Sequence, residues 1–349
     1  MAYTTIDKPT DYFNTKIYTG NGVNSTDSQS ITGVGFQPNW VWIKNRDTTN
    51  WHILSDSVRG GNKVLYTNRT DAERSDVDWY LQTFDSDGFT VGYSGDTNGN
   101  GNSLVSWNWL AGGSASSNSD GSITSSVSAN TTAGFSIVSY TGTGANATVG
   151  HGLGVAPKMI IVKNRSTAGN WPVFHETQGG TKIQWLNLTN ATATESGWWN
   201  NTDPTSSVFS IGTQNDLNKS SDNIIAYCFA EKKGYSKFGS YTGNGNADGT
   251  FVYTGFKPAW LLYKRSDDST GRDWQIYDNK RSTHNELNKR LRANTSDAET
   301  TSTGIDFTSN GFKLRTSDGN YNASGANYIY MAFAENPFVT STGIPTTAR

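Results

Sequence analysis

Cysteine is almost missing from this sequence. Its 349 residues contain one, Cys228, which excludes an intramolecular disulfide and a zinc site built from several thiolates. The mostly apolar neighbours in IIAYCFAE (224–231) predict a buried, unreactive thiol. The four histidines are His52, His151, His175 and His284. None has the spacing of a metal-binding motif, so we expect them at solvated or hydrogen-bonded loop positions.

Charge and long apolar runs are also scarce. Charged residues make up 17% of the chain, below the roughly 25% of ordinary globular proteins. The formal net charge of −2 gives no electrostatic drive toward nucleic acid or anionic membrane. No apolar run approaches the length of a membrane span, and the opening MAYTTIDKPTDYF lacks the apolar region of a secretory signal. We therefore expect neither membrane insertion nor nucleic-acid binding.

Aromatic residues and glycine are plentiful instead. The chain has 12 Trp, 16 Tyr, 15 Phe and 37 Gly. The aromatic residues provide enough material for a hydrophobic core and argue against wholesale disorder.

Four short motifs occur three times in the same order. The first is YTGNG (18–22), YTGTG (140–144) and YTGNG (241–245). The second is GFQPNWVWIKNR (35–46), GVAPKMIIVKNR (154–165) and GFKPAWLLYKRS (255–266). The third is SDGFTVG (86–92), SSVFSIG (206–212) and SNGFKLR (309–315), and the fourth is LVSWNWLA (104–111), IIAYCFAE (224–231) and IYMAFAE (329–335). The period of about 100 residues is that of a small domain and too long for a solenoid.

These motifs predict three tandem domains. We place repeat 1 at 1–112, repeat 2 at 134–235 and repeat 3 at 236–349. The intervening residues 113–133 are rich in Gly, Ser and Asn, which predicts a flexible linker. Repeats 2 and 3 have almost no linker, so we expect them to pack together while repeat 1 is tethered more loosely.

Each motif is typical of a β-strand. The apolar runs are short, β-branched and bounded by Gly-containing turns. The Pro of the second motif stands just before a strand, and the Lys marks where the strand meets water. IYMAFAE is apolar at alternate positions on both faces, which predicts a strand covered on both sides. We predict an all-β protein of three β-sandwich repeats, jelly-roll or lectin-like. The segments 67–76, 187–196 and 293–302 offer at most single helical turns.

Taken together, GFQPNWVWIKNR, DSVRG (56–60), FDSDGFTVG (84–92), IIAYCFAE and KFGSYTGNG (237–245) resemble a repeated domain of unknown function in virion proteins of marine tailed phages. The resemblance covers nearly the whole chain, including the closing IPTTAR (344–349). It implies a structural, tail-fibre-like virion protein with lectin-like β domains, exposed on the particle surface after assembly in the host cytoplasm. HETQGG (175–180) departs from the pattern of DSVRGG (56–61), so a role of Asp56 and Arg59 is not shared by all copies.

Three hypotheses about function follow. The first is a non-enzymatic tail-fibre, receptor-binding or host-adhesion protein, which binds other virion proteins and a host glycan or receptor and forms homo-oligomers. The second is a capsid-decoration or head-fibre protein. The third is a glycan-cleaving tailspike, although the sequence singles out no pair of catalytic carboxylates.

The best candidate for sugar binding is GWWNN (197–201). Trp198 and Trp199 would stack on a sugar ring while Asn200 and Asn201 bind its hydroxyls, and Trp79 with Tyr80 lies near the corresponding place in repeat 1. The alternative is that one Trp plugs the sandwich and the other packs on a neighbour.

No cofactor is expected. Three aspartates offer a weak alternative as calcium ligands: Asp85, Asp87 and Asp96. Simple turn capping explains them equally well.

Overall fold

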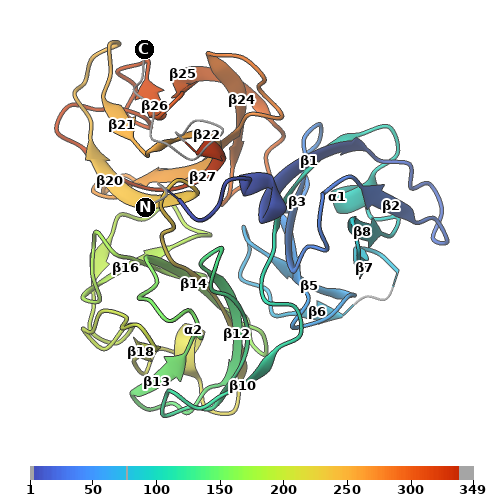
Figure 1. Cartoon of the computed structure of the whole chain (residues 1–349), viewed down its shortest axis with the longest axis vertical. Helices are drawn as coiled ribbons and strands as arrows, with labels where there is room; N and C mark the ends of the chain where they lie inside the picture. The colour runs from blue at the N-terminus through green and yellow to red at the C-terminus, as the bar shows by residue number, and fades with distance from the viewer. Residues whose placement is uncertain (1–3, 76–77, 338–349) are drawn as a thin grey trace.

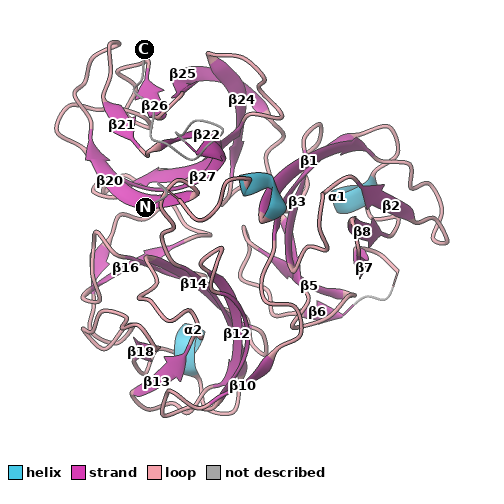
Figure 2. Ribbon diagram, viewed as in Figure 1, coloured by secondary structure: helices cyan, strands magenta, loops and turns pink. Residues whose placement is uncertain are grey.

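Nearly every element of the protein is a β-strand, as the alternating apolar patterns predict. A computed structural model describes residues 4–75 and 78–337 (Figures 1 and 2). In Figure 1 three lobes surround a common centre. Among the described residues, no helix is long and apolar enough to cross a lipid bilayer. The closing motif IPTTAR lies outside the described residues.

The three lobes follow one another along the chain. After the 3₁₀ turn η1 (Pro9–Asp11), the first lobe has β1 (Phe13–Thr19), β2 (Gln29–Thr32), β3 (Trp40–Asn45), β4 (Ile53–Asp56), β5 (Lys63–Tyr66), β6 (Arg74–Ser75), β7 (Leu81–Asp85), β8 (Gly88–Val91), α1 (Gly95–Asn98) and β9 (Ser103–Trp109). The second has β10 (Ser116–Asn118), β11 (Ser125–Asn130), β12 (Phe135–Thr141), β13 (Ala147–Gly150), β14 (Met159–Asn164), β15 (Pro172–His175), β16 (Lys182–Trp185), β17 (Ala193–Thr194), β18 (Val208–Ile211), α2 (Asn215–Asn218) and β19 (Asn223–Phe229). The third has β20 (Ser236–Thr242), β21 (Phe251–Tyr253), β22 (Phe256–Arg265), β23 (Gln275–Asp278), β24 (Leu287–Arg292), β25 (Thr300–Thr308), β26 (Gly311–Leu314) and β27 (Asn327–Pro337).

Strands pair in a similar order in each lobe. The orders are β1-β9-β3-β4-β5-β6, β12-β19-β14-β15-β16-β17 and β20-β27-β22-β23-β24-β25. All pairs of named strands are antiparallel. In each lobe the strand with the Pro-to-Lys motif pairs with the strand that carries the last motif. The matching registers are Trp42 with Trp107, Ile161 with Tyr227, and Leu262 with Met331.

The lobes close differently. In the third lobe eight strands form one sheet that is nearly a barrel. There the nine-residue β25 pairs with both β24 and β26. In the second lobe the corresponding stretch contains only the two-residue β17, and a two-stranded sheet of β13 and β18 stays separate. The first lobe likewise keeps β2, β8 and β7 apart. The nearly closed sheet of the third lobe therefore differs from the simple sandwich that the sequence predicts.

The central strands of the lobes bury both faces, as IYMAFAE predicts. Alternate residues of β27 face an apolar cluster that all three lobes share: Ile329, Met331 and Phe333. The residues between them face the third lobe's own core: Tyr330, Ala332 and Ala334. The strands β3, β14 and β22 alternate in the same way. One face of each strand thus stabilises its lobe and the other joins the lobes.

The shared cluster is largely aromatic. Trp40 of the first lobe lies 5.7 Å from Phe229 of the second, measured between ring centroids. Trp109 of the first lobe lies 5.4 Å from Trp260 of the third, and Phe229 lies 6.2 Å from Phe333. The first lobe therefore packs against both others, and the expectation that it is loosely tethered is wrong.

Residues 113–133 are not a flexible linker in this structure. They include the whole of β10 and β11, and β11 pairs with β12 of the second lobe over five residues. Val127 is 5% exposed and joins the second lobe's core. Backbone pairing and burial of every second side chain outweigh the Ser-rich composition. The proposed boundaries of the repeats themselves stay a prediction.

The YTG motifs form matching contacts in all three lobes. Tyr18, Tyr140 and Tyr241 each donate a hydrogen bond to a backbone carbonyl just before a buried asparagine. The asparagines are Asn98, Asn218 and Asn322, and each side-chain oxygen accepts the N–H that follows the motif glycine. A Cβ on Gly20, Gly142 or Gly243 would lie 2.2–2.3 Å from a carbonyl oxygen. Only glycine permits this close approach, so the motif fixes the turn after the first strand.

The expected single helical turns are not formed. The segment 187–196 contains β17, the segment 293–302 contains the start of β25, and the described part of 67–76 contains β6. The short helices α1 and α2 instead end at two of the buried asparagines, Asn98 and Asn218.

Candidate functional site

The predicted tryptophan platform is buried. Trp198 is 6% and Trp199 1% exposed, and both belong to the second lobe's core. Trp198 donates to Glu195 and packs edge-on against Trp185, while Trp199 packs edge-on against Phe174. Neither indole offers a face to a sugar ring, so the stacking interpretation is wrong and both rings plug the lobe.

The other predicted binding residues are scattered. Asn200 and Asn201 are exposed in the second lobe with positive φ angles, and Asn200 accepts a hydrogen bond from Asn146. Tyr80 is buried in the first lobe, where its hydroxyl accepts from Tyr66. Trp79 remains 42% exposed, and the guanidinium carbon of Arg74 lies 5.1 Å from its ring. The structure does not gather these six residues into one site.

The repeated lysines do not meet water. Lys44, Lys163 and Lys264 are each 0% exposed. Burial lowers the pKa of Lys44 and Lys163 to about 8 and that of Lys264 to about 7. Their ammonium groups donate to backbone carbonyls; Lys163, for example, bonds Gly169 of its own lobe at 2.6 Å and Thr70 of the first lobe at 2.8 Å. The predicted solvated position is wrong because all three strand ends are buried. Lys163 and Lys264 bond carbonyls of a neighbouring lobe, and Lys44 bonds carbonyls of its own.

Each lobe contacts the next in the same sense. Arg165 of the second lobe makes two hydrogen bonds to Glu73 of the first, and Arg46 of the first makes two to Glu299 of the third. Lys264 closes the circle by donating to the carbonyl of Thr189 in the second lobe, at 2.8 Å. Three matching backbone bonds accompany them: Glu73 N to Arg165 O, Glu299 N to Arg46 O, and Thr192 N to Ser266 O. The three interfaces form a closed ring.

Buried charges join two of the interfaces. Asp56 binds Arg59 and accepts a hydrogen bond of 2.7 Å from Tyr227 of the second lobe. Asp278 likewise binds Arg281 and accepts one of 2.9 Å from Trp107 of the first lobe.

The third interface uses histidine instead. In the third lobe, the position of Tyr227 and Trp107 is held by Met331, whose side chain has no hydrogen-bond donor. In the second lobe, the position of Asp56 and Asp278 is held by His175. His175 donates from Nε2 to the carbonyl of Tyr330, at 3.1 Å. HETQGG thus has a histidine in place of the aspartate where the facing strand offers a backbone carbonyl in place of a side-chain donor.

The remaining histidines and the aspartates serve the fold. His52 and His151 are buried at loop positions and hydrogen-bonded, which is one of the two predicted settings, and His284 is exposed. Asp87 caps the N–H groups of Gly33 and Gly35, Asp85 accepts from two threonines, and Asp96 accepts from Asn50 and the Trp51 N–H. Among the described residues, no three His, Cys, Asp or Glu side chains gather as metal ligands would. The aspartates therefore fit turn capping better than calcium binding.

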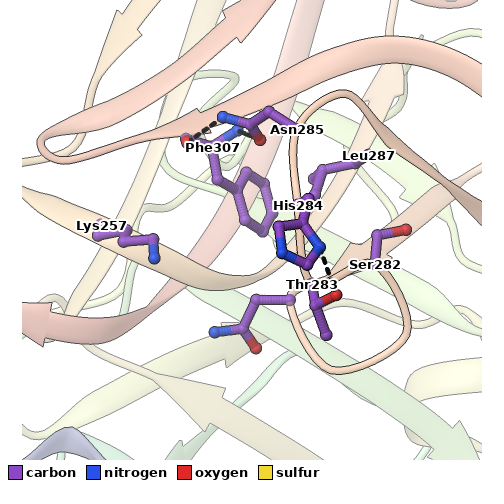
Figure 3. Close-up of a pocket in the computed structure, with 8 residues that line it drawn as sticks. Lys257, Ser282, Thr283, His284, Asn285, Leu287 and Phe307 are labelled. Atoms are coloured by element: carbon purple, nitrogen blue, oxygen red, sulfur yellow. Dashed lines mark hydrogen bonds between the residues drawn. The ribbon is translucent and has the colours of Figure 1, made fainter.

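One small pocket lies on the third lobe (Figure 3). Its volume is about 120 Å³, and it is lined by Lys257, Asn279, Ser282, Thr283, His284, Asn285, Leu287 and Phe307. Asn285 exchanges two hydrogen bonds with the backbone of Phe307, and His284 Nδ1 lies 2.8 Å from the Thr283 hydroxyl. Lys257 is paired with Glu335. Among the residues that the structure describes, no carboxylate lines this pocket to pair with the imidazole as an acid–base couple would.

A larger pocket of about 230 Å³ lies on the first lobe. It is lined by Trp51, Tyr66, Arg69, Asp71, Ala72 and Arg74. None of the repeated motifs points to this pocket, because Trp51 and Arg69 lie outside them. A comparison of the three copies, position by position, would have singled out these two residues as unlike their counterparts.

Comparison with known families finds one match. The model of a family described as Domain of unknown function (DUF7483) matches residues 8–337. Comparison with curated proteins finds no match.

Proposed function

Because the chain belongs to the DUF7483 family, whose description assigns no activity, we propose a function from the geometry and from the motifs. The protein is a non-enzymatic structural component of a virus particle, and it works as a tail-fibre or host-adhesion protein. The virion role rests on the resemblance of the motifs to phage virion proteins. The adhesive role is supported by the shared apolar cluster and the ring of hydrogen bonds, which join the lobes into one body.

One observation carries the non-enzymatic part of this proposal. The polar side chains of the repeated motifs are engaged within and between the lobes. Lys163 bonds backbone carbonyls, and Asp56 bonds Arg59 and Tyr227. Groups held in this way brace a scaffold, whereas catalytic groups converge on a space that a substrate can enter.

We also propose that the lobes are tandem copies of one β domain. The shared pairing order, the three YTG contacts and the head-to-tail ring support this view. A single adhesive body with three lobes could present several weak sites at once, which raises avidity by roughly 10²–10⁴ when the geometry permits joint binding.

Locating the protein on purified particles tests the proposal. We expect antibodies against the recombinant chain to label the tail in electron micrographs. We also expect the free protein to compete with particles for adsorption to host cells. Label on the head would instead favour a capsid-decoration role, and absence of the chain from purified particles by mass spectrometry would contradict any virion role.

A further inference from the structure

The pocket on the first lobe has an ion pair within reach of a ligand. Arg69 stacks on Trp51, with its guanidinium carbon 4.0 Å from the ring centroid. Its Nε and Nη2 donate to the two oxygens of Asp71, at 2.5 and 3.1 Å. The side chains of Arg69 and Asp71 are 34% and 42% exposed. Among the described residues, none accepts a hydrogen bond from Nη1 of Arg69. This N–H donor and the acceptor oxygens of Asp71 therefore lie side by side at the pocket.

The second lobe holds this part of the first lobe in place. The carbonyl of Thr70 accepts from Lys163 and from the N–H of Gly169, both at 2.8 Å. The indole of Trp171 donates to the carbonyl of Arg69, at 3.1 Å. A loop fixed by buried partners loses little entropy when it binds a ligand. The ion pair is therefore pre-organised.

The corresponding positions of the other lobes lack the tryptophan and the arginine, and only the third lobe has an aspartate in place of Asp71. Three asparagines anchor the comparison, because the side chain of each accepts a hydrogen bond from the backbone N–H of the residue directly before β4, β15 or β23: Asn68 from His52, Asn187 from Trp171, and Asn294 from Trp274. Counted from these anchors, Trp51 corresponds to Asn170 and Asp273, Arg69 to Leu188 and Thr295, and Asp71 to Asn190 and Asp297. The scaffold thus accepts quite different side chains here, and stability alone does not require the set found in the first lobe.

We propose that this pocket binds one neutral sugar ring of a surface glycan through two adjacent hydroxyl groups. One hydroxyl accepts from Nη1 of Arg69, and the other donates to Asp71. Trp51 and Ala72, which also line the pocket, offer apolar surface to the ring. The volume is below the roughly 300–1,000 Å³ of ordinary ligand pockets, which fits one ring of a longer chain.

The existing ion pair favours a polyol over an anion. A carboxylate or sulfate would compete with Asp71 for Arg69 and would face the Asp71 charge. A pair of hydroxyls uses the donor and the acceptor together and leaves the ion pair intact. Binding should therefore change little between about 0.05 and 0.5 M salt, unlike the binding of a polyanion.

The experiment uses the full chain on an array of neutral and acidic surface oligosaccharides, with dextran, mannan, polygalacturonate and dextran sulfate as reference probes. The strongest neutral probe is then titrated against wild type, Arg69→Leu and Asp71→Asn. Each variant places in the first lobe a residue that the second lobe has at the same position. Asp297→Asn, the same change at the corresponding position of the third lobe, is the matched control.

We expect a neutral probe to bind, and each pocket variant to weaken binding about tenfold or more, since one hydrogen bond to a charged group is lost. The control should bind like wild type, and all variants should retain the wild-type circular dichroism spectrum. Three results would overturn the proposal. The first is that no neutral probe binds. The second is that only polyanions bind and that high salt abolishes their binding. The third is that both pocket variants bind like wild type.

This inference rests on the proposed adhesive function, but the two can fail separately. If wild type and Arg69→Leu compete equally well with particles for host cells, the pocket assignment is wrong and adhesion stands. If the chain is absent from particles while the purified protein binds a neutral sugar through Arg69 and Asp71, the virion role is wrong and the pocket stands.

Discussion

Removal of the Asp56 carboxylate should strongly destabilise the protein. Asp56 and Arg59 have side chains that are 0% exposed. The carboxylate accepts from the backbone N–H and side chain of Arg59 and from the hydroxyl of Tyr227 across the lobe interface. Asp56→Ala removes all three bonds and leaves the arginine buried.

The size of the effect follows from what Arg59 retains. Breaking a buried ion pair by removing one partner costs about 3–5 kcal/mol. Arg59 keeps a bond of 3.2 Å to Glu73 and one of 3.1 Å to the carbonyl of Leu54. We therefore expect the low end, about 3 kcal/mol. Tyr227→Phe removes only the contact between lobes and should cost about 1.5–3 kcal/mol, the usual value for a hydrogen bond to a charged group.

Guanidinium unfolding followed by tryptophan fluorescence measures both losses. The shared aromatic centre predicts one cooperative transition, so free energies of unfolding can be compared. The double variant should lose less than the sum of the single changes, because both remove the same contact. Exposed Asp7 provides a control, and Asp7→Ala should change stability by no more than about 0.5 kcal/mol. A free energy of unfolding for Asp56→Ala within about 0.5 kcal/mol of wild type would contradict this role of the buried carboxylate.

Three further predictions concern the features that the sequence analysis misjudged. The pKa values of Lys44, Lys163 and Lys264 are lowered to about 7–8 by burial, while an unfolded lysine titrates near 10.4. Between these pKa values the unfolded chain binds more protons than the folded chain, so the melting temperature should rise from about pH 8 to 10. A melting temperature that stays constant over this pH range would contradict the prediction, and Lys264→Met should reduce the rise. Trp198→Ala should lower the free energy of unfolding by about 3–5 kcal/mol, since it empties a core site; a change below about 1 kcal/mol in chemical denaturation would show that the ring is not a core plug. Residues 113–133 should resist limited proteolysis because they are paired in a sheet; a first cut there, mapped by mass spectrometry, would restore the linker interpretation.

Local patterns were sufficient to predict strands but not their partners. The alternation in IYMAFAE predicts a strand covered on both sides, and β27 is such a strand. The same pattern cannot show that one cover is a centre shared by three lobes. The YTG motif marks a turn, yet its meaning depends on an asparagine such as Asn98, which lies 77 residues from its partner Asn21.

The errors in the predicted site have the same origin. Lys163 ends its strand with a charge, which normally meets water, but a carbonyl from Thr70, 93 residues away, takes that place. The Trp pair in GWWNN is flanked by polar loop residues, and nothing in that stretch reveals the cavity that the indoles fill. Ser125 to Asn130 has the composition of a linker, and only its pairing with β12 makes it a strand.

The closed circle of contacts between Arg165 and Glu73, Arg46 and Glu299, and Lys264 and Thr189 has a consequence for assembly. A trimer of separate chains falls apart on dilution, because its formation depends on concentration. Here one peptide chain connects the three lobes, so the three interfaces form within a single molecule and do not depend on protein concentration. Identical subunits must also change together, whereas each lobe of one chain can vary alone. The first lobe can therefore acquire Trp51 and Arg69 while the other two keep residues that serve the fold.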